Sequence, residues 1–213
     1  MSGQWGGPPP CPGCRGYLLS AGNLTAIDFR GDPSSNTRVQ GINSRGDVVG
    51  RYTSSDNHVH GFLRSSSGTY TSIDFPGANL TQAFGINARG AIVGFYSENA
   101  APLGCAPCHP FLRTSAGTYT TLTVAAAGAS TRVLARGVNN RGDIVGAYDA
   151  PNGNGVPFLL ERNGTSLSLA VPPGVPPGTA DSDAFGINAP GNIVGDYPDS
   201  SGMGHGYLLV GAR

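Results

Sequence analysis

The chain has 213 residues, enough for one sizeable domain or two small ones. Charged residues make up 12 % of it and the formal net charge is zero, which argues against nonspecific binding to nucleic acid or to an anionic membrane surface. No apolar run approaches the roughly 18–20 residues of a membrane span, so we expect neither a membrane span nor a nucleic-acid partner.

The first 14 residues, MSGQWGGPPPCPGC, are rich in proline, glycine and cysteine. They have neither the basic n-region nor the apolar h-region of a signal peptide. We therefore expect an N-terminal arm over residues 1–14, followed by a single repeat domain over residues 15–213.

A short motif, Gly-[Ile/Val]-Asn, recurs four times along that domain. Two residues, a glycine, one further residue and then [Ile/Val]-Val-Gly-x-Tyr follow each copy. The four copies read GINSRGDVVGRY (41–52), GINARGAIVGFY (85–96), GVNNRGDIVGAY (137–148) and GINAPGNIVGDY (186–197). This regularity predicts four copies of one structural unit.

Each unit is predicted to form four short strands, which we name A to D. In the clearest unit, strand A lies around Gly41-Ile42-Asn43, and a tight glycine turn leads to the β-branched strand B at 48–52. Strand C begins at Phe62-Leu63, and strand D is the threonine-rich segment 70–75. One extra C strand is expected at Tyr17-Leu18, before the first A strand. No segment has a sustained helical apolar period, so we expect almost no helix.

A lone four-stranded sheet cannot cover both of its faces, so the copies must stack on one another. The size of the unit favours an all-β propeller of four blades, each with four antiparallel strands, in which the two chain ends close one blade. The extra strand near Tyr17 makes one strand more than four such blades need. A five-bladed ring or a strand-exchanged assembly is therefore the alternative.

These motifs, G-I-N-x-x-G-x-I-V-G-x-Y followed by H-G-F-L and T-x-I-D-F-P-G-A, resemble the HAF-type bacterial extracellular repeat family. The match spans about residues 15–210, and its best unit is 38–82. The resemblance implies secretion or display at the cell surface, so we expect an extracellular or cell-surface location. It implies no catalytic residues.

The cysteines form two C-x-x-C pairs, Cys11 with Cys14 and Cys105 with Cys108, each just before a C strand. We expect each pair to close a small disulfide loop, as suits an exported protein. The alternatives are a zinc site shared between molecules, and haem c attachment at the C-x-x-C-H run that ends at His109. Haem is disfavoured because His109 recurs in other units without cysteines beside it.

Two further sets of polar residues recur at fixed places in the repeat. We expect them to be scaffold, bonded to turn backbone or between blades, rather than catalytic. They are Asn43, Asn87, Asn139 and Asn188 of the Gly-[Ile/Val]-Asn motifs, and His60, His109 and His205 before the C strands.

Strand direction alternates, so the short A–B and C–D turns share one face of the disc, and the longer B–C and D–A connections share the other. We call the second one the loop face, and variable loops on a rigid scaffold are where binding usually occurs. An acidic loop face would suit Ca²⁺ or sugar hydroxyls, and we expect no other cofactor. Its candidate binding residues are Asp56, His58, Glu98, Asp149, Asp181, Asp183 and Asp199.

We expect a non-enzymatic exported module that binds a carbohydrate or protein partner, or serves in surface assembly, through the loop face. One alternative is a polysaccharide hydrolase or lyase whose carboxylates come from these loops. The other is a structural subunit that polymerises into a homo-oligomer through the extra N-terminal strand.

Overall fold

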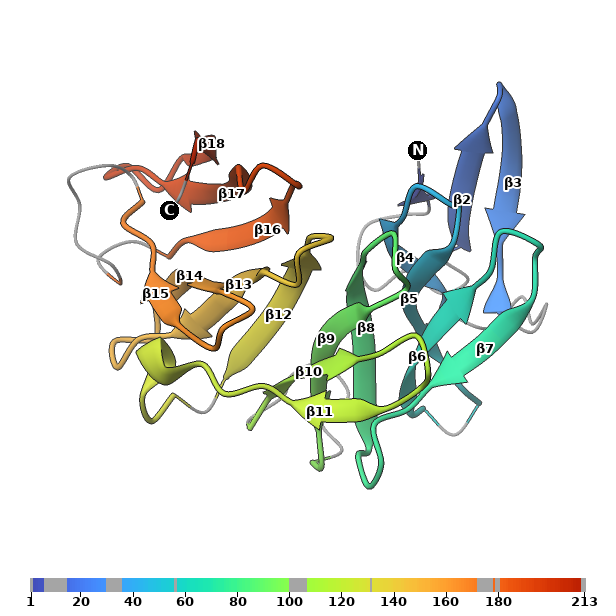
Figure 1. The fold of residues 1–213 in the computed structure, drawn as a ribbon, viewed down its shortest axis with the longest axis horizontal. Coiled ribbons are helices and arrows are strands. Elements are labelled where there is room, and N and C mark those ends of the chain that lie inside the picture. The colour runs from blue at the N-terminus through green and yellow to red at the C-terminus, as the bar shows by residue number, and fades with distance from the viewer. Residues whose placement is uncertain are drawn as a thin grey trace.

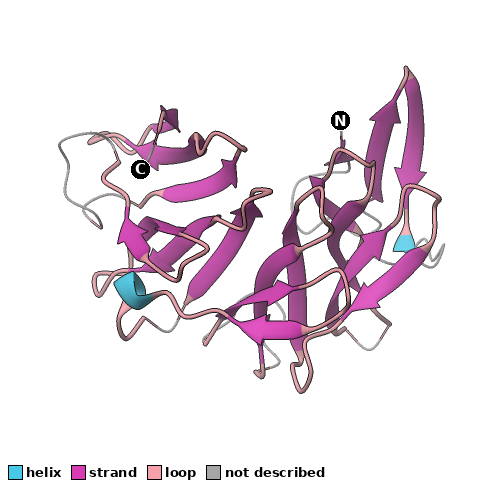
Figure 2. Ribbon diagram, in the orientation of Figure 1, coloured by secondary structure: helices cyan, strands magenta, loops and turns pink. Residues whose placement is uncertain are grey.

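The computed structural model describes residues 2–5, 15–29, 36–55, 57–99, 107–130, 132–171, 178 and 181–211. Eighteen strands run through these residues, and the helical elements are short 3₁₀ turns such as Ala125–Ala127 (Figure 2). The predicted all-β class is therefore confirmed, with no α-helix in the described part of the chain.

Three sheets contain the complete A-B-C-D order that the repeat predicts. They are β4 (Arg38–Ile42), β5 (Val48–Thr53), β6 (Val59–Arg64) and β7 (Tyr70–Ile73); β8 (Leu80–Ile86), β9 (Ile92–Ser97), β10 (His109–Arg113) and β11 (Tyr119–Thr121); and β12 (Val133–Val138), β13 (Ile144–Asp149), β14 (Gly155–Leu160) and β15 (Ser166–Ser168). Neighbours within each sheet pair antiparallel, and one parallel bridge, from Val59 to Leu80, links the first two sheets.

A three-stranded sheet lies at each end of this series. The N-terminal sheet contains β1 (Ser2–Trp5), β2 (Arg15–Ser20) and β3 (Asn23–Ile27), and the C-terminal sheet contains β16 (Asp183–Ile187), β17 (Ile193–Pro198) and β18 (Gly204–Leu209). The second lacks a D strand among the described residues.

Strand β1 corrects the expectation of a simple arm over residues 1–14. Gly3 pairs with Tyr17 across β1 and β2, just as Gly50 pairs with Phe62 across a B and a C strand. Strand β1 is therefore a B strand, and the described part of the N-terminal sheet has the order B-C-D.

The predicted four-bladed closure is not confirmed. It requires the extra C strand, β2, to lie in the same sheet as the last repeat, but the ladders pair β2 with β1 and β3. In Figure 1 the five sheets follow one another along a curved arc, and the two termini lie on either side of its opening. Strands β4, β8, β12 and β16 line the inner side of this arc.

Each sheet packs face to face on the next. The face toward the following sheet, which we call the leading face, carries the second apolar residue of the B strand, such as Val49 and Val145. The opposite, trailing face carries the Phe of the C strand. Phe62, Phe111 and Phe158 are all completely buried on trailing faces. The four resulting apolar layers between sheets are the core.

Candidate functional site

A β-bulge in each A strand places one side chain that differs from unit to unit on the inner side of the arc. The ladder between A and B strands shifts register between Val39 and Gly41, and at the same point in β8, β12 and β16. The invariant glycine of the B strand lies opposite; a Cβ at Gly94 would lie 1.9 Å from the Gln82 carbonyl oxygen. The extra residues at the four bulges are Gln40, Phe84, Arg136 and Phe185.

These four side chains line an axial groove of about 430 Å³ between β4, β8, β12 and β16. The groove is otherwise lined by the Gly-[Ile/Val] residues of the four motifs. Phe185 is 45 % exposed, Gln40 is also exposed, and Phe84 and Arg136 are half-buried. The groove therefore offers an aromatic face, an amide and a cation among glycine and aliphatic residues.

Arg136 is the central group of this groove. Its guanidinium lies between two aromatic rings, 5.3 Å from the centroid of Phe84 and 5.2 Å from that of Phe185. Its Nη2 also forms an ion pair of 2.6 Å with Asp183. The rings and the carboxylate together fix the guanidinium.

The Arg136–Asp183 pair is incompletely satisfied. Arg136 Nε and Asp183 Oδ1 are both buried and neither has a hydrogen-bond partner. Burial raises the pKa of Asp183 to about 6, against the opposing effect of Arg136, and the neighbouring Asp196 raises it further. Such a shift is common at functional sites.

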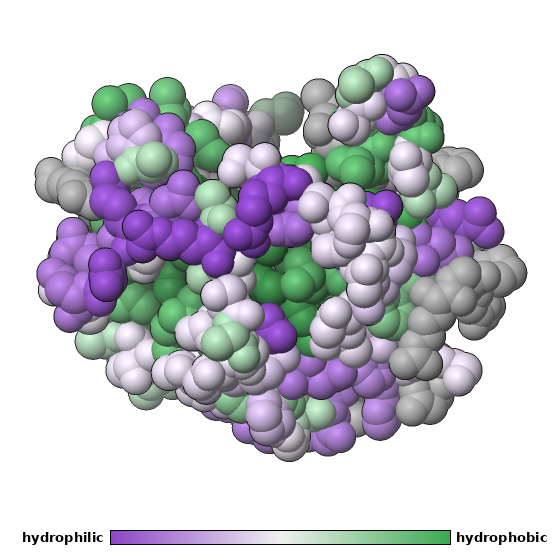
Figure 3. Space-filling view, turned by 45° about the vertical axis from the view of Figure 1, so that its right-hand side comes forward, coloured by the Kyte–Doolittle hydropathy of each residue, from purple (hydrophilic) through white to green (hydrophobic). Residues whose placement is uncertain are grey.

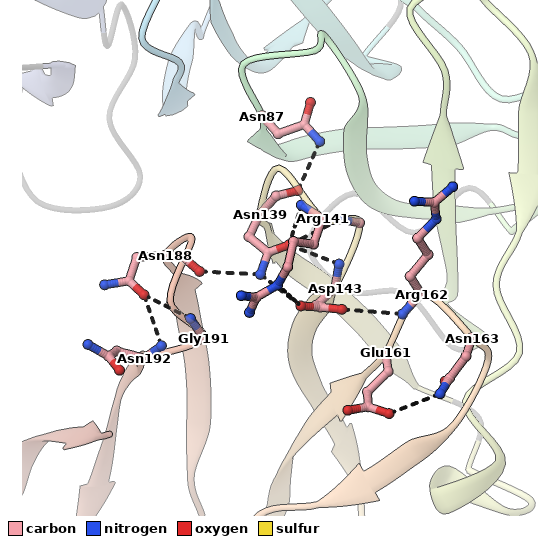
Figure 4. A network of polar contacts seen from close by, with 11 residues as sticks. Asn87, Asn139, Arg141, Asp143, Glu161, Arg162, Asn163, Asn188, Gly191 and Asn192 are labelled. Carbon is pink, nitrogen blue, oxygen red and sulfur yellow. Dashed lines mark hydrogen bonds and ion pairs between the residues drawn. The ribbon is translucent and has the colours of Figure 1, made fainter. Parts of the chain in front are cut away.

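The side opposite the loop face is built around the recurring asparagines (Figure 4). Asn139 Oδ1 accepts hydrogen bonds from the backbone N–H groups of Arg141, Gly142 and Asp143, which closes its own A–B turn. Its Nδ2 donates to Asp143 Oδ2 and, across the sheet boundary, to the carbonyl of Asn188.

The same relay runs from Asn43 to the carbonyl of Asn87 and from Asn87 to the carbonyl of Asn139. The bonds to turn backbone are those that the sequence suggests, and the asparagines in addition tie successive sheets together.

The repeat histidines also make local contacts. His60 stacks on Tyr52 and bonds to Asp74 at 2.7 Å, while His109 and His205 pack beside the equivalent tyrosines. Arg15 takes the place of histidine in the N-terminal sheet and pairs with Asp28.

The predicted loop-face residues are not gathered into one site. Three of them contact neighbours within their own part of the fold: Glu98 pairs with His109, Asp149 pairs with Arg132, and Asp181 accepts a hydrogen bond from the Gly155 N–H.

The remaining predicted residues lie elsewhere. Asp199 pairs with His205, and hydrogen bonds from Ser201 and His205 lower the pKa of Asp199. His58 lies 6.4 Å from His60, ring to ring, and Asp183 is the acid beside the axial groove. Asp56 lies outside the described residues.

A cavity of about 620 Å³ does lie on the loop face, between residues 126–130 and residues 148–151. Four of its nine lining residues are alanine, and each polar side chain among the rest has a protein partner. Asp149 pairs with Arg132 at 2.8 Å, the Ser130 hydroxyl donates to the Arg132 carbonyl, and the Tyr148 hydroxyl bonds to Ser168. The polar side chains of this cavity are therefore already engaged within the protein, whereas Gln40 of the axial groove is exposed.

The disulfide prediction falls mostly on Cys11, Cys14 and Cys105, which lie outside the described residues. Cys108 is 1 % exposed and is not a free thiol, but its predicted partner is Cys105, so the bond stays a prediction. Within the described ranges, no group of three or more His, Cys, Asp or Glu side chains could hold a metal ion, and the suggestion of Ca²⁺ stays untested.

Comparison with protein-family models gave no match. Comparison with curated proteins found no significant relative either. None of the helical segments that the structure describes is both long and apolar enough to cross a membrane. The function is therefore inferred from the site itself.

The axial residues can be located in the sequence, although they are not part of the recurring motif. Each of them directly precedes a Gly-[Ile/Val]-Asn motif, in a position that holds Gln, Phe, Arg or Phe while its neighbours recur. Variation at one position of a conserved repeat marks a place where the scaffold does not dictate the side chain.

Proposed function

We propose that this protein is an exported, non-catalytic repeat module that binds a carbohydrate in its axial groove. The observation that carries the proposal is the stack of Phe84, Arg136 and Phe185 at the exposed end of the groove. An exposed aromatic ring beside fixed hydrogen-bonding groups matches a sugar, which has apolar C–H faces and hydroxyls that both donate and accept.

The groups present divide this work between them. Phe185 would stack on the sugar ring, while the Gln40 amide and the accessible part of the Arg136 guanidinium would bond to its hydroxyls. Asp183 acts as a positioning residue, because its ion pair holds Arg136 between the rings. An exported location is supported by the family resemblance and by the two C-x-x-C pairs.

We also propose that the five sheets are blades of a propeller-like arc rather than coils of a straight solenoid. Support comes from the four inner strands, whose bulges converge on one groove. The four-bladed closed ring remains the alternative, and it would require the N-terminal strands to move into the sheet of β16–β18.

Binding can be tested by isothermal titration calorimetry with a panel of neutral cello-, xylo-, manno- and chito-oligosaccharides. We expect at least one to bind, and Phe185→Ala to weaken it by about tenfold or more, the loss expected for an aromatic stacking surface. Leu167→Ala is the matched control, because Leu167 is likewise 45 % exposed but lies outside the groove. No binding, or equal loss in both variants, would contradict the proposal.

A second candidate function, polysaccharide hydrolysis, has one observation in its favour. Asp183 and Asp196 face each other across β16 and β17, and Asp183 has a raised pKa, as a general acid needs. An assay of reducing-sugar release on the bound oligosaccharide separates the two functions. Turnover that Asp196→Asn abolishes would favour the enzyme, whereas binding without turnover favours the module.

A further inference from the structure

The leading face of the C-terminal sheet is apolar and uncovered. Val194 is 48 % exposed, whereas the equivalent valines of the three preceding sheets, Val49, Val93 and Val145, are completely buried. Leu208 of the neighbouring strand β18 is 60 % exposed, against 3 % for its counterpart Leu159. The same residue types are thus present, but none of the described sheets packs on them.

The trailing face of the N-terminal sheet also carries exposed apolar side chains. Leu19 and Leu24 are partners in the β2–β3 ladder and are 37 % and 68 % exposed. The equivalent pair in the next sheet is Arg64 and Tyr70, which form a cation–π contact. Figure 3 shows hydrophobic side chains at the surface where this sheet protrudes, at the upper right.

These faces are not built as ends of a soluble stack. Terminal repeats that face only water carry a polar outer surface, because an exposed apolar face associates with others. The N-terminal sheet has two leucines where the next sheet has the Arg64–Tyr70 pair. The C-terminal sheet has Val194 and Leu208, the same residue types that are buried in the interior sheets. Both faces are therefore expected to pack against another apolar surface.

The interior of the molecule shows what covers such faces. At the boundary between β1–β3 and β4–β7, Ile27 and Phe29 of the leading face pack on Val48 and Phe62 of the trailing face. At the boundary between β12–β15 and β16–β18, Val145 and Leu159 pack on Ile193 in the same way. A leading face is covered by a trailing face at each boundary, and a second copy of this chain presents a trailing face on which Leu24 is 68 % exposed.

We propose that the leading face of β16–β18 in one copy packs on the trailing face of β1–β3 in the next, so that the protein assembles head to tail. The two contacting surfaces are different, so the interface is heterologous and its repetition gives a filament or a larger ring. This assembly uses sheet faces, not strand exchange, and it leaves the axial groove of each copy intact.

Sedimentation velocity over a range of concentrations tests the proposal with one variant for each face. Leu208→Glu places a charge on the leading face of β16–β18, and Leu24→Glu places one on the trailing face of β1–β3. Both positions are exposed, so each charge should block packing at its own face only. We expect the wild type to form species larger than a dimer and each variant alone to be monomeric. An equimolar mixture of the two should form a dimer and nothing larger, because it contains one intact pair of faces per two chains.

Leu167→Glu is the control for an added charge at an exposed leucine on another sheet, and it should assemble like the wild type. Leu208→Gln and Leu24→Gln repeat the experiment should circular dichroism show that a glutamate variant is unfolded. A monomeric wild type, self-association of either variant alone, or a mixture that stays monomeric would overturn head-to-tail assembly.

Discussion

The interior sheets and the end sheets carry the same motif in different surroundings. Val145 in β13 and Val194 in β17 occupy the same place in the repeat, yet the first is fully buried and the second is half exposed. The B strand does not bury its own valine; the trailing face of the following sheet does. Stability in this molecule therefore belongs to the boundaries between sheets, as in other stacked repeats.

The largest expected difference between the two regions concerns the asparagine relay. Asn139 is 3 % exposed and makes five hydrogen bonds, whereas Asn188, at the end of the relay, is exposed. We expect Asn139→Ala to lower the free energy of unfolding by about 3–4 kcal/mol because it leaves buried partners unsatisfied, and Asn188→Ala by about 1 kcal/mol. Urea denaturation of both variants measures this; equal losses would contradict the comparison.

The pH dependence should differ as well, because the C-terminal sheet has the acid Asp183 where the interior sheets have Arg38, Gln82 and Leu134. The folded-state pKa of about 6 lies above the ordinary 3.8, so the folded protein binds the proton more tightly. Stability from this group is thus greatest below pH 4 and is lost as pH rises to about 6, by roughly 2–3 kcal/mol.

Asp183→Asn removes this dependence. Relative to the wild type, its free energy of unfolding should increase between pH 4 and pH 6.5, where the wild type loses the contribution of the protonated carboxyl. The measurement is a series of urea denaturations at fixed ionic strength, with Asp199→Asn as the control for an exposed acid. A parallel pair of curves for wild type and Asp183→Asn would show that the pKa is not raised.

The smallest effect is expected from the valines. Val145→Ala leaves a cavity in a packed layer and should cost about 2 kcal/mol, whereas Val194→Ala, on the uncovered leading face, should cost less than about 0.5 kcal/mol. Thermal unfolding of the two variants, followed at low protein concentration, compares them. A cost for Val194→Ala equal to that of Val145→Ala would mean that another surface covers β17 even in the monomer.

Local pattern was enough to predict the strands, but not their surroundings. The tight turns and β-branched runs specify A to D in each unit because these signals are contained within a few residues. Strand β1 was missed because the proline-rich segment after Trp5 hides the match between Gly3-Gln4-Trp5 and the Gly-x-Tyr of other B strands.

The axial site was missed for a different reason. A consensus contains only the positions that recur, so a position that varies between units is not part of it. The four axial residues occupy the same place in the repeat but have different side chains: Gln40, Phe84, Arg136 and Phe185. Their convergence depends on how four sheets are arranged, which no single unit encodes. The closure of the arc depends on the same long-range packing, and the expectation of one closed blade followed from strand counting alone.

Hydrogen–deuterium exchange of the wild-type protein at low and at high concentration shows whether a trailing face covers each leading face. Raising the concentration should slow backbone exchange in β17 and β18 and in β2 and β3, while β13 and β14, covered within the chain, should not change. Exchange that is independent of concentration in all of these strands would contradict this packing.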